Sequence, residues 1–237
     1  MSVGLIAALP AEARFATGRK IPSGTPVSVN EHLVVCVSGM GPEKASRAAR
    51  QLIEHGVGGL VSWGTSAALV EELKAGDLVL PGRIHGHSGR DYATDARWRD
   101  AIRQCVHETV SGCHVGGLAE TPCILRTVAE KTGLHQRTGA ICADMETAAI
   151  LTAAGKAGLP AIAVRAIIDE RHVVLPEPLT RHMNDYGEPD LQRLVMSIFL
   201  NPVLVPRIMR LAGAMQKAGR TLDTVRRMAN RSLQFNQ

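Results

Sequence analysis

Three carboxylates stand where an open α/β sheet presents side chains to a ligand. Glu12 follows the first apolar run of the chain, Glu146 begins a helical stretch, and Asp169 ends a later β-branched run. Ligands bind such sheets in the crevice at the carboxyl ends of the strands. The three acids could therefore converge on one rim, where carboxyl groups can serve general acid–base chemistry on a bound ligand. Each acid also has a structural explanation, as a first-turn acid of a helix or as a turn cap, but the set of three favours a site.

Glycine-containing turns give a second, weaker indication of a ligand site. They follow predicted strands at residues 38–42, 63–67 and 116–117. Glycine lets the backbone approach a ligand closely, and N–H groups at a helix start can hold an anion, although glycine also punctuates α/β turns for purely steric reasons. On this basis Gly41, Gly64 and Ser66 are candidate phosphate- or purine-binding groups. Arg165 is a fourth candidate, which could bind phosphate or pair with an acid.

Metal and disulfide chemistry are not predicted. The histidines lack metal-ligand spacing. The five cysteines form no C-x-x-C pair and are odd in number, which favours free thiols in a reducing compartment. The apolar start at residues 3–9 has no basic segment before it and is interpreted as a strand rather than a signal peptide. We therefore expect a cytoplasmic protein without a metal or organic cofactor.

Short apolar runs alternate with helical stretches, which is typical of an α/β sheet with crossover helices. Strands are predicted at residues 3–9, 33–38, 59–63, 77–81, 114–119, 140–142 and 161–168. Helices are predicted at residues 42–55, 95–109, 124–132, 145–157 and 190–200, and in the tail. We expect one α/β domain over residues 1–200 and a helical C-terminal extension over residues 201–237. Residues 171–188 are predicted to form a long loop beside Asp169, of the kind that often serves as a lid.

The positive charge of the chain is concentrated in this extension. The formal net charge is +5, yet residues 201–237 alone carry seven basic side chains against one acid, Asp223. Only seven aromatic residues occur in the chain, so the pattern does not fit nucleic-acid binding, in which basic residues are interleaved with aromatics. Ile208, Leu211, Met215 and Leu222 fall on one side of a predicted amphipathic helix. That helix could pack on the core or dock on an anionic membrane surface.

The chain resembles the purine nucleoside phosphorylase and nucleosidase superfamily. The resembling segments are Gly4-Leu5-Ile6-Ala7-Ala8 with Glu12, Ser38-Gly39-Met40-Gly41, Gly64-Thr65-Ser66, Leu73-Lys74-Ala75-Gly76-Asp77, Met145-Glu146, and Val164-Arg165-Ala166-Ile167-Ile168-Asp169. They cover residues 1 to about 170 in family order, and the branch they are most similar to contains methylthioadenosine/S-adenosylhomocysteine nucleosidase. The resemblance implies a three-layer sandwich around a mixed sheet, and a homo-oligomer.

The resemblance also implies a role for each matching residue. Asp169 matches the acid that protonates N7 of the departing purine. Glu146 matches the carboxylate that binds the ribose hydroxyls, and Met145 the residue that packs against the sugar. Glu12 matches the acid that activates water in hydrolytic members, and Thr65 stands where a serine commonly lies near ribose or phosphate. Cleavage of this bond develops positive charge on the sugar and negative charge on the base, so both carboxyl roles favour the transition state.

Two departures from the nucleosidase pattern affect the predicted base pocket. Ile168 replaces the small hydroxyl residue that usually precedes the catalytic aspartate, and Ala67-Ala68 replaces a glycine pair. The segment 198–211 is similar to the C-terminal extension of hopanoid-associated phosphorylases, which act on adenosylhopane. The resemblance therefore implies release of adenine from a 5′-substituted adenosine with a lipid tail, converting adenosylhopane to ribosylhopane or phosphoribosylhopane. A lipid-tailed substrate is compatible with a cytoplasmic enzyme that could also attach peripherally to the inner membrane.

Three alternatives stay open. Phosphate could be a co-substrate, or water could attack the sugar. The substrate could be methylthioadenosine or S-adenosylhomocysteine instead of a lipid nucleoside. The chain could also be a non-catalytic nucleoside- or lipid-binding protein on the same scaffold.

Overall fold

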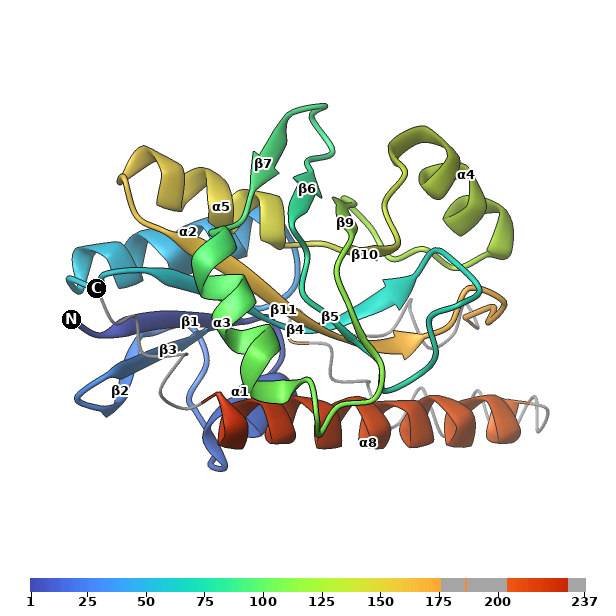
Figure 1. The fold of residues 1–237 in the computed structure, drawn as a ribbon, viewed down its shortest axis with the longest axis horizontal. Coiled ribbons are helices and arrows are strands. Elements are labelled where there is room, and N and C mark those ends of the chain that lie inside the picture. Colours follow the sequence, from blue (N-terminus) through green and yellow to red (C-terminus); the bar gives the residue numbers. More distant parts are fainter. Residues whose placement is uncertain (176–185, 187–203, 230–237) are drawn as a thin grey trace.

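A mixed β-sheet forms the middle layer of the protein (Figure 1). The computed structural model describes residues 1–175, 186 and 204–229. Its strands are β1 (Val3–Ala7), β2 (Val27–Asn30), β3 (Leu33–Val37), β4 (Leu60–Ala68), β5 (Leu78–Val79), β6 (Arg83–His85), β7 (Asp91–Ala93), β8 (Cys113–His114), β9 (Gly117–Glu120), β10 (Cys142–Asp144) and β11 (Ala161–Asp169). The helices are α1 (Pro10–Thr17), α2 (Pro42–Glu54), α3 (Ala96–Val106), α4 (Val128–Thr138), α5 (Thr147–Lys156) and α8 (Leu204–Met228).

The long strand β4 is the centre of the sheet. The main strand order is β2-β3-β1-β4-β10-β9-β6-β7, and β11 pairs with β4 and β5. β4 is parallel to β1 and β11 but antiparallel to β10. The carboxyl ends of β1 and β11 therefore meet at one edge beside β4, which is where the candidate acids had been predicted to converge.

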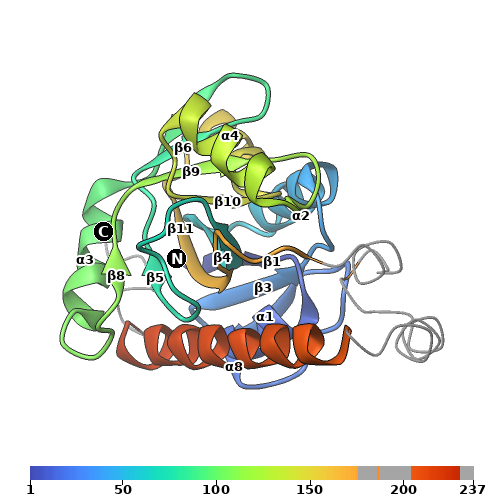
Figure 2. The same ribbon diagram turned by 90° about the vertical axis from the view of Figure 1, so that its right-hand side faces the viewer.

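Two apolar cores lie on the two faces of this sheet. One joins side chains of α1, α3 and α8 to Leu5, Val61 and Ile162, and the other joins α2 and α5 to Ile6 and Leu60. Neighbouring residues of a strand point to opposite faces, so Leu5 and Ile6 enter different cores. Figures 1 and 2 show α8 along one face and α2 with α5 on the other. The predicted α/β sandwich around a mixed sheet is confirmed.

Helix α8, from the predicted extension, packs on the sheet instead of standing apart from it. Ala214, Ala218, Leu222 and Val225 are buried, and α8 contacts α1, α3 and β11. Its approach to α1 is close, because a Cβ atom at Gly219 would overlap the ring of Phe15. The C-terminal part of α8, from Ala214 onward, therefore packs on the core, which was one of the two alternatives for the tail. A domain boundary at residue 200 stays a prediction.

Several predicted boundaries differ from the structure for local reasons. The first strand ends at Ala7, because Pro10 starts α1, a helix that had not been predicted. Helix α4 begins later than predicted, after Thr127, whose hydroxyl accepts from the Glu130 amide over 3.2 Å while Glu130 accepts from the Thr127 amide. This Thr-x-x-Glu capping box was legible in the sequence. The region 114–119 forms two short strands, β8 and β9, and the strand predicted at 140–142 is displaced to Cys142–Asp144.

Other differences concern elements that the sequence did not indicate or the structure does not describe. The short strands β2, β6 and β7 had not been predicted. The turn predicted at residues 63–67 is wrong, because Gly64 lies inside β4. The helix predicted at 190–200 lies outside the described residues, as does most of the loop predicted at 171–188.

Candidate active site

All three candidate acids line one cavity of about 230 Å³. Glu12 comes from the first turn of α1, Glu146 from the N-cap of α5, and Asp169 from the last position of β11. Met145, Thr65 and Ser66 line the same cavity. The structure therefore brings together residues that are up to about 160 positions apart in the chain.

Glu12 is held by three hydrogen bonds and is 3% exposed. Its Oε1 accepts from the amide of Thr65 at 2.8 Å and from the hydroxyl of Thr65 at 2.7 Å, and its Oε2 accepts from the amide of Leu9 at 3.1 Å. A Cβ atom at Gly64 would lie 2.7 Å from this carboxylate, so glycine is required here for close approach. Burial raises the pKa of Glu12, and the positive charge of Arg165 opposes that shift.

Glu146 is fixed by backbone amides of two segments. Its Oε1 accepts from the amide of Gly41 at 2.8 Å, and its Oε2 accepts from the amide of Met145 at 3.2 Å. Burial raises the pKa of Glu146, and the nearby carboxylate of Asp144 raises it further. Gly41 thus serves the site by orienting Glu146.

Arg165 is buried beneath these acids and paired with Asp144. Its Nη2 lies 2.6 Å from Asp144 Oδ2, and its Nε donates to the same oxygen at 2.9 Å. Nη2 also donates to the hydroxyls of Ser62 at 2.6 Å and Thr147 at 2.9 Å. Of the two alternatives left open for Arg165, these contacts favour pairing with an acid. The positive charge of Arg165 opposes the rise in the pKa values of Glu12 and Glu146 that burial causes. Arg165 therefore compensates part of the negative charge that is buried around it.

Asp169 ends β11 at a register shift between Ile167 and Asp169, which interrupts the strand alternation. The side chain is 3% exposed. Its Oδ2 lies 2.8 Å from Nζ of Lys131, a fully buried side chain of α4. Burial raises the pKa of Asp169, as its proposed role as an acid requires, and the Lys131 ammonium opposes part of the rise.

The residues that sequence reasoning missed come from two helices, α4 and α8, and from strand β10. Lys131 lies in a helix with no chemical motif. Asp144 lies two positions before Glu146, just outside the Met145-Glu146 segment, and had no assigned role. Leu211 and Met215 of α8 line the cavity, and their place on the predicted apolar face was the signal that could have found them. The glycine pair at residues 116–117 does not line this cavity.

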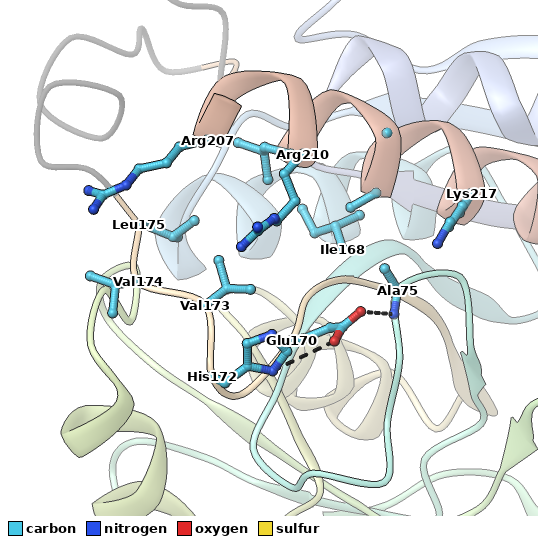
Figure 3. A pocket seen from close by; sticks show the side chains of 13 residues that line it. Ala75, Ile168, Glu170, His172, Val173, Val174, Leu175, Arg207, Arg210 and Lys217 are labelled. Atoms are coloured by element: carbon cyan, nitrogen blue, oxygen red, sulfur yellow. Dashed lines mark hydrogen bonds and ion pairs between the residues drawn. The ribbon is translucent and has the colours of Figure 1, made fainter. Parts of the chain in front are cut away.

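A second cavity of about 550 Å³ adjoins the first, since Ile168, Leu175 and Leu211 line both. Figure 3 shows Arg207, Arg210 and Lys217 of α8 along one side of it. On the opposite side, Glu170 Oε1 accepts from the Ala75 amide at 3.1 Å. The other carboxylate oxygen of Glu170, Oε2, lies 3.7 Å from Nδ1 of His172. The cavity therefore has apolar walls where it meets the first one and three cations on one side.

Neither a metal-binding cluster nor a membrane-spanning helix is found in the part of the chain that the structure describes. Within residues 1–175, 186 and 204–229, no group of three histidine, cysteine, aspartate or glutamate side chains could hold a metal ion. Among the same residues, no helix combines the length and apolar character needed to cross a bilayer.

Comparison with known proteins identifies the family. Residues 2–188 match the model of the phosphorylase superfamily. The chain belongs to the phosphorylase superfamily. This superfamily member is 29% identical over 154 residues to a DeoD-type purine nucleoside phosphorylase of Clostridium perfringens. The match covers 60% of this chain and 65% of the relative, so the chain spans about two thirds of the length of the curated relative it matches.

Solved structures of nucleosidases share the fold of this superfamily member. Futalosine hydrolase of Helicobacter pylori aligns with a TM-score of 0.69 at 17% identity, covering 95% of this chain and 97% of that one. The 5′-methylthioadenosine/S-adenosylhomocysteine nucleosidase of Helicobacter pylori, bound to butyl-thio-DADMe-Immucillin-A, aligns with a TM-score of 0.69 at 16% identity, with the same coverage. These similarities establish the fold.

Proposed function

We propose that the protein cleaves the N-glycosidic bond of a 5′-substituted adenosine and releases adenine. The observation that carries this proposal is that Glu12, Glu146 and Asp169 line one cavity together with Met145 and Thr65. Membership of the phosphorylase superfamily agrees with it.

Cleavage of the glycosidic bond develops negative charge on the base and positive charge on the sugar, so the two sides need different stabilising groups. Asp169, whose pKa is raised by burial, acts as the acid: its carboxyl proton passes to N7 of the purine while the bond electrons move to the base. Glu146 accepts hydrogen bonds from the ribose hydroxyls and stabilises the positive charge that develops on the sugar. General acid catalysis of this kind contributes about two to four powers of ten in rate.

Water is the attacking group that the contacts favour. Glu12 stands in the cavity with its carboxylate fixed by three donors, and it can take a proton from a water molecule as the oxygen attacks the sugar. Arg165, the candidate phosphate ligand, already donates to Asp144, Ser62 and Thr147. Phosphate as co-substrate is the alternative.

For the 5′ substituent we propose a large apolar group, and specifically the hopane of adenosylhopane. The catalytic cavity of about 230 Å³ adjoins the second cavity of about 550 Å³, and Ile168, Leu175 and Leu211 line both. A ribose oriented by Glu146 could direct its 5′ substituent past these apolar side chains. Ile168, which departs from the nucleosidase pattern, forms part of this connection.

The surface around the second cavity supports peripheral membrane attachment. Val174 is 49% exposed beside it, and Val205 and Met209, on the same turns of α8 as Arg207 and Arg210, are 39% and 69% exposed. Exposed apolar side chains beside basic ones are typical of surfaces that lie in an anionic membrane interface. We propose that the first turns of α8 dock there, and that the rest of the helix packs on the core.

Adenine release measured with and without phosphate tests the reaction. We expect release without phosphate, and loss of most turnover in Asp169→Asn. Equal function of Asp169→Asn would instead indicate the non-catalytic nucleoside or lipid sensor. An absolute requirement for phosphate would replace hydrolysis by phosphorolysis.

Comparing adenosylhopane with methylthioadenosine tests the substrate. We expect a higher kcat/KM for adenosylhopane, together with sedimentation of the protein with vesicles of anionic but not neutral lipid. Preference for the small thionucleoside would establish the rival methylthioadenosine/S-adenosylhomocysteine nucleosidase, which the fold similarity to the Helicobacter pylori nucleosidase favours. Light scattering of the same sample tests the expected homo-oligomer.

A further inference from the structure

Lys131 is a fully buried lysine whose ammonium group has three oxygen partners. Its Nζ lies 2.8 Å from Asp169 Oδ2, and it donates to the backbone carbonyl oxygens of Glu170 at 2.8 Å and Val173 at 3.0 Å. An ammonium has three donors and no acceptor, and this one donates to two carbonyl groups and forms an ion pair with one carboxylate. A buried lysine is rare unless it is paired, and this one is paired with the acid of the proposed reaction.

We propose that Lys131 is a positioning residue that holds one carboxyl oxygen of Asp169 and leaves the other free for the base. This proposal rests on the proposed function. Both carboxyl oxygens of Asp169 are buried, but Oδ2 has the Lys131 ion pair, whereas Oδ1 has neither a hydrogen-bond nor an ion-pair partner among the described residues, as expected of an atom whose partner is a ligand. The same ammonium binds the chain just after β11 through two carbonyl groups, so it places the acid and the turn that follows it as one unit.

The charge of Lys131 also limits how weak an acid Asp169 becomes. Burial alone would raise the pKa of Asp169 strongly, and an opposite charge at this distance lowers it. Among the neighbouring groups, His172 also lowers the pKa of Asp169 and Glu170 raises it, while Glu130 acts on Lys131. Glu12 and Glu146 lie in the same cavity. Lys131 touches Asp169 directly and is the largest of these opposing influences.

One proton moves in the proposed step, from Asp169 to the base. The carboxyl O–H of protonated Asp169 gives its proton to N7, the electrons of the glycosidic bond pass to the base, and the resulting carboxylate faces the Lys131 ammonium. Lys131 keeps its three protons throughout. The ion pair thus stabilises the state of Asp169 that follows proton transfer, which helps the transfer itself.

Lys131→Met, Lys131→Arg and Arg171→Gln separate this role from a structural one. Arg171 is the matched control, since it donates to Thr132 of the same helix at 3.1 Å and pairs with Glu71 but does not contact Asp169. For Lys131→Met acting on adenosylhopane, we expect kcat to fall at least about tenfold with a smaller change in KM. The alkaline limb of kcat should move up by about one pH unit or more, because the acid has lost its opposite charge. Lys131→Arg should restore much of kcat and much of the wild-type pH profile. Arg171→Gln should leave the alkaline limb of the kcat profile at the wild-type pH.

A second readout does not need turnover. Titration of the Asp169 carboxyl carbon by nuclear magnetic resonance, assigned with Asp169→Asn, should give a higher pKa in Lys131→Met than in the wild type, by about one unit or more. If Lys131→Met does not fold, Lys131→Gln is measured in the same way. An unmoved carboxyl titration, or an equal shift in Arg171→Gln, overturns the role of Lys131. Failure of the wild type to release adenine overturns the proposed function instead, and the titration still decides the role of Lys131.

Discussion

The amide of Gly41 donates to Glu146 Oε1 over 2.8 Å, and this bond joins the start of α2 to the start of α5. The two residues are 105 positions apart. Sequence analysis had assigned Gly41 to a ligand phosphate or purine and Glu146 to the ribose. This hydrogen bond fixes the orientation of the Glu146 carboxylate, so one residue of the predicted site positions another.

The pH dependence of stability should report the burial of Glu146. Its pKa is raised above the ordinary 4.5 by burial and by Asp144. A carboxyl group with a raised pKa contributes its full stability below its ordinary value, and that contribution is lost as pH rises through the raised value. In Glu146→Gln, where the amide oxygen can still accept from Gly41, the fall in unfolding free energy between pH 5 and 9 should be smaller than in the wild type. Each unit of pKa shift corresponds to about 1.4 kcal/mol.

Urea denaturation of both proteins at pH 5, 7 and 9 measures this difference. Glu12 and Asp169 also have raised pKa values, but both are present in the two proteins, so the difference between the proteins reports Glu146 together with its interaction with Glu12. Parallel pH dependences in the two proteins would contradict the assignment.

Gly64→Ala should displace the Glu12 side chain and so abolish its function, although Glu12 itself is unchanged. The new methyl carbon would lie 2.7 Å from the carboxylate, so Glu12 must leave the Thr65 donors. We expect kcat for adenine release to fall at least about a hundredfold, within the range of general acid–base catalysis. Gly155→Ala, a glycine of α5 with nothing within 4 Å of the added carbon, is the control and should keep activity. Normal turnover by Gly64→Ala would show that Glu12 is not needed in its observed place.

Arg165→Met should destabilise the protein more than it affects substrate affinity. It would leave Asp144 buried without its partner, and breaking a buried ion pair costs about 3–5 kcal/mol. Thermal unfolding measures the loss. The companion double variant Arg165→Met with Asp144→Leu removes both charges, so it should recover part of that stability. A phosphate-binding role would instead appear as a loss of phosphate affinity with stability unchanged.

Two glycines of α8 should respond oppositely to alanine. Gly219→Ala would overlap the ring of Phe15, and overpacking a tight contact costs about 1–3 kcal/mol. Gly213→Ala meets nothing within 4 Å and should stabilise the helix by up to about 1 kcal/mol, because alanine favours helix over glycine. Chemical denaturation of the two variants checks whether α8 is docked as observed. Equal effects would mean that the α1–α8 contact does not form in solution.

The class of the fold was predictable because its cause is local. Period-two and period-3.6 apolar patterns read directly as strands and helices, and runs such as Ala161–Asp169 are buried at nearly every position. Short elements were the ones missed: β6 and β7 have three residues each, too few to carry a periodic signal. Their pairing with each other and with β9 holds them in place.

The acids of the site were predictable for the same reason, whereas their partners were not. Glu12, Glu146 and Asp169 each follow or begin an element, and the topology of α/β sheets brings such positions to one edge. Lys131 and Gly64 gained their roles from contacts across the fold: one meets Asp169 from α4, and the other makes room for Glu12 inside β4. A single sequence carries no signal for such pairs.

By itself, the order of residues determined which elements form and which side chains reach the carboxyl edge of the sheet, since those properties follow from local spacing. Only the tertiary structure decided that Arg165 pairs with Asp144, that Lys131 meets Asp169, and that Leu211 and Met215 close the cavity from α8. These outcomes depend on how separate elements pack, and packing is set by the shapes of both partners at once.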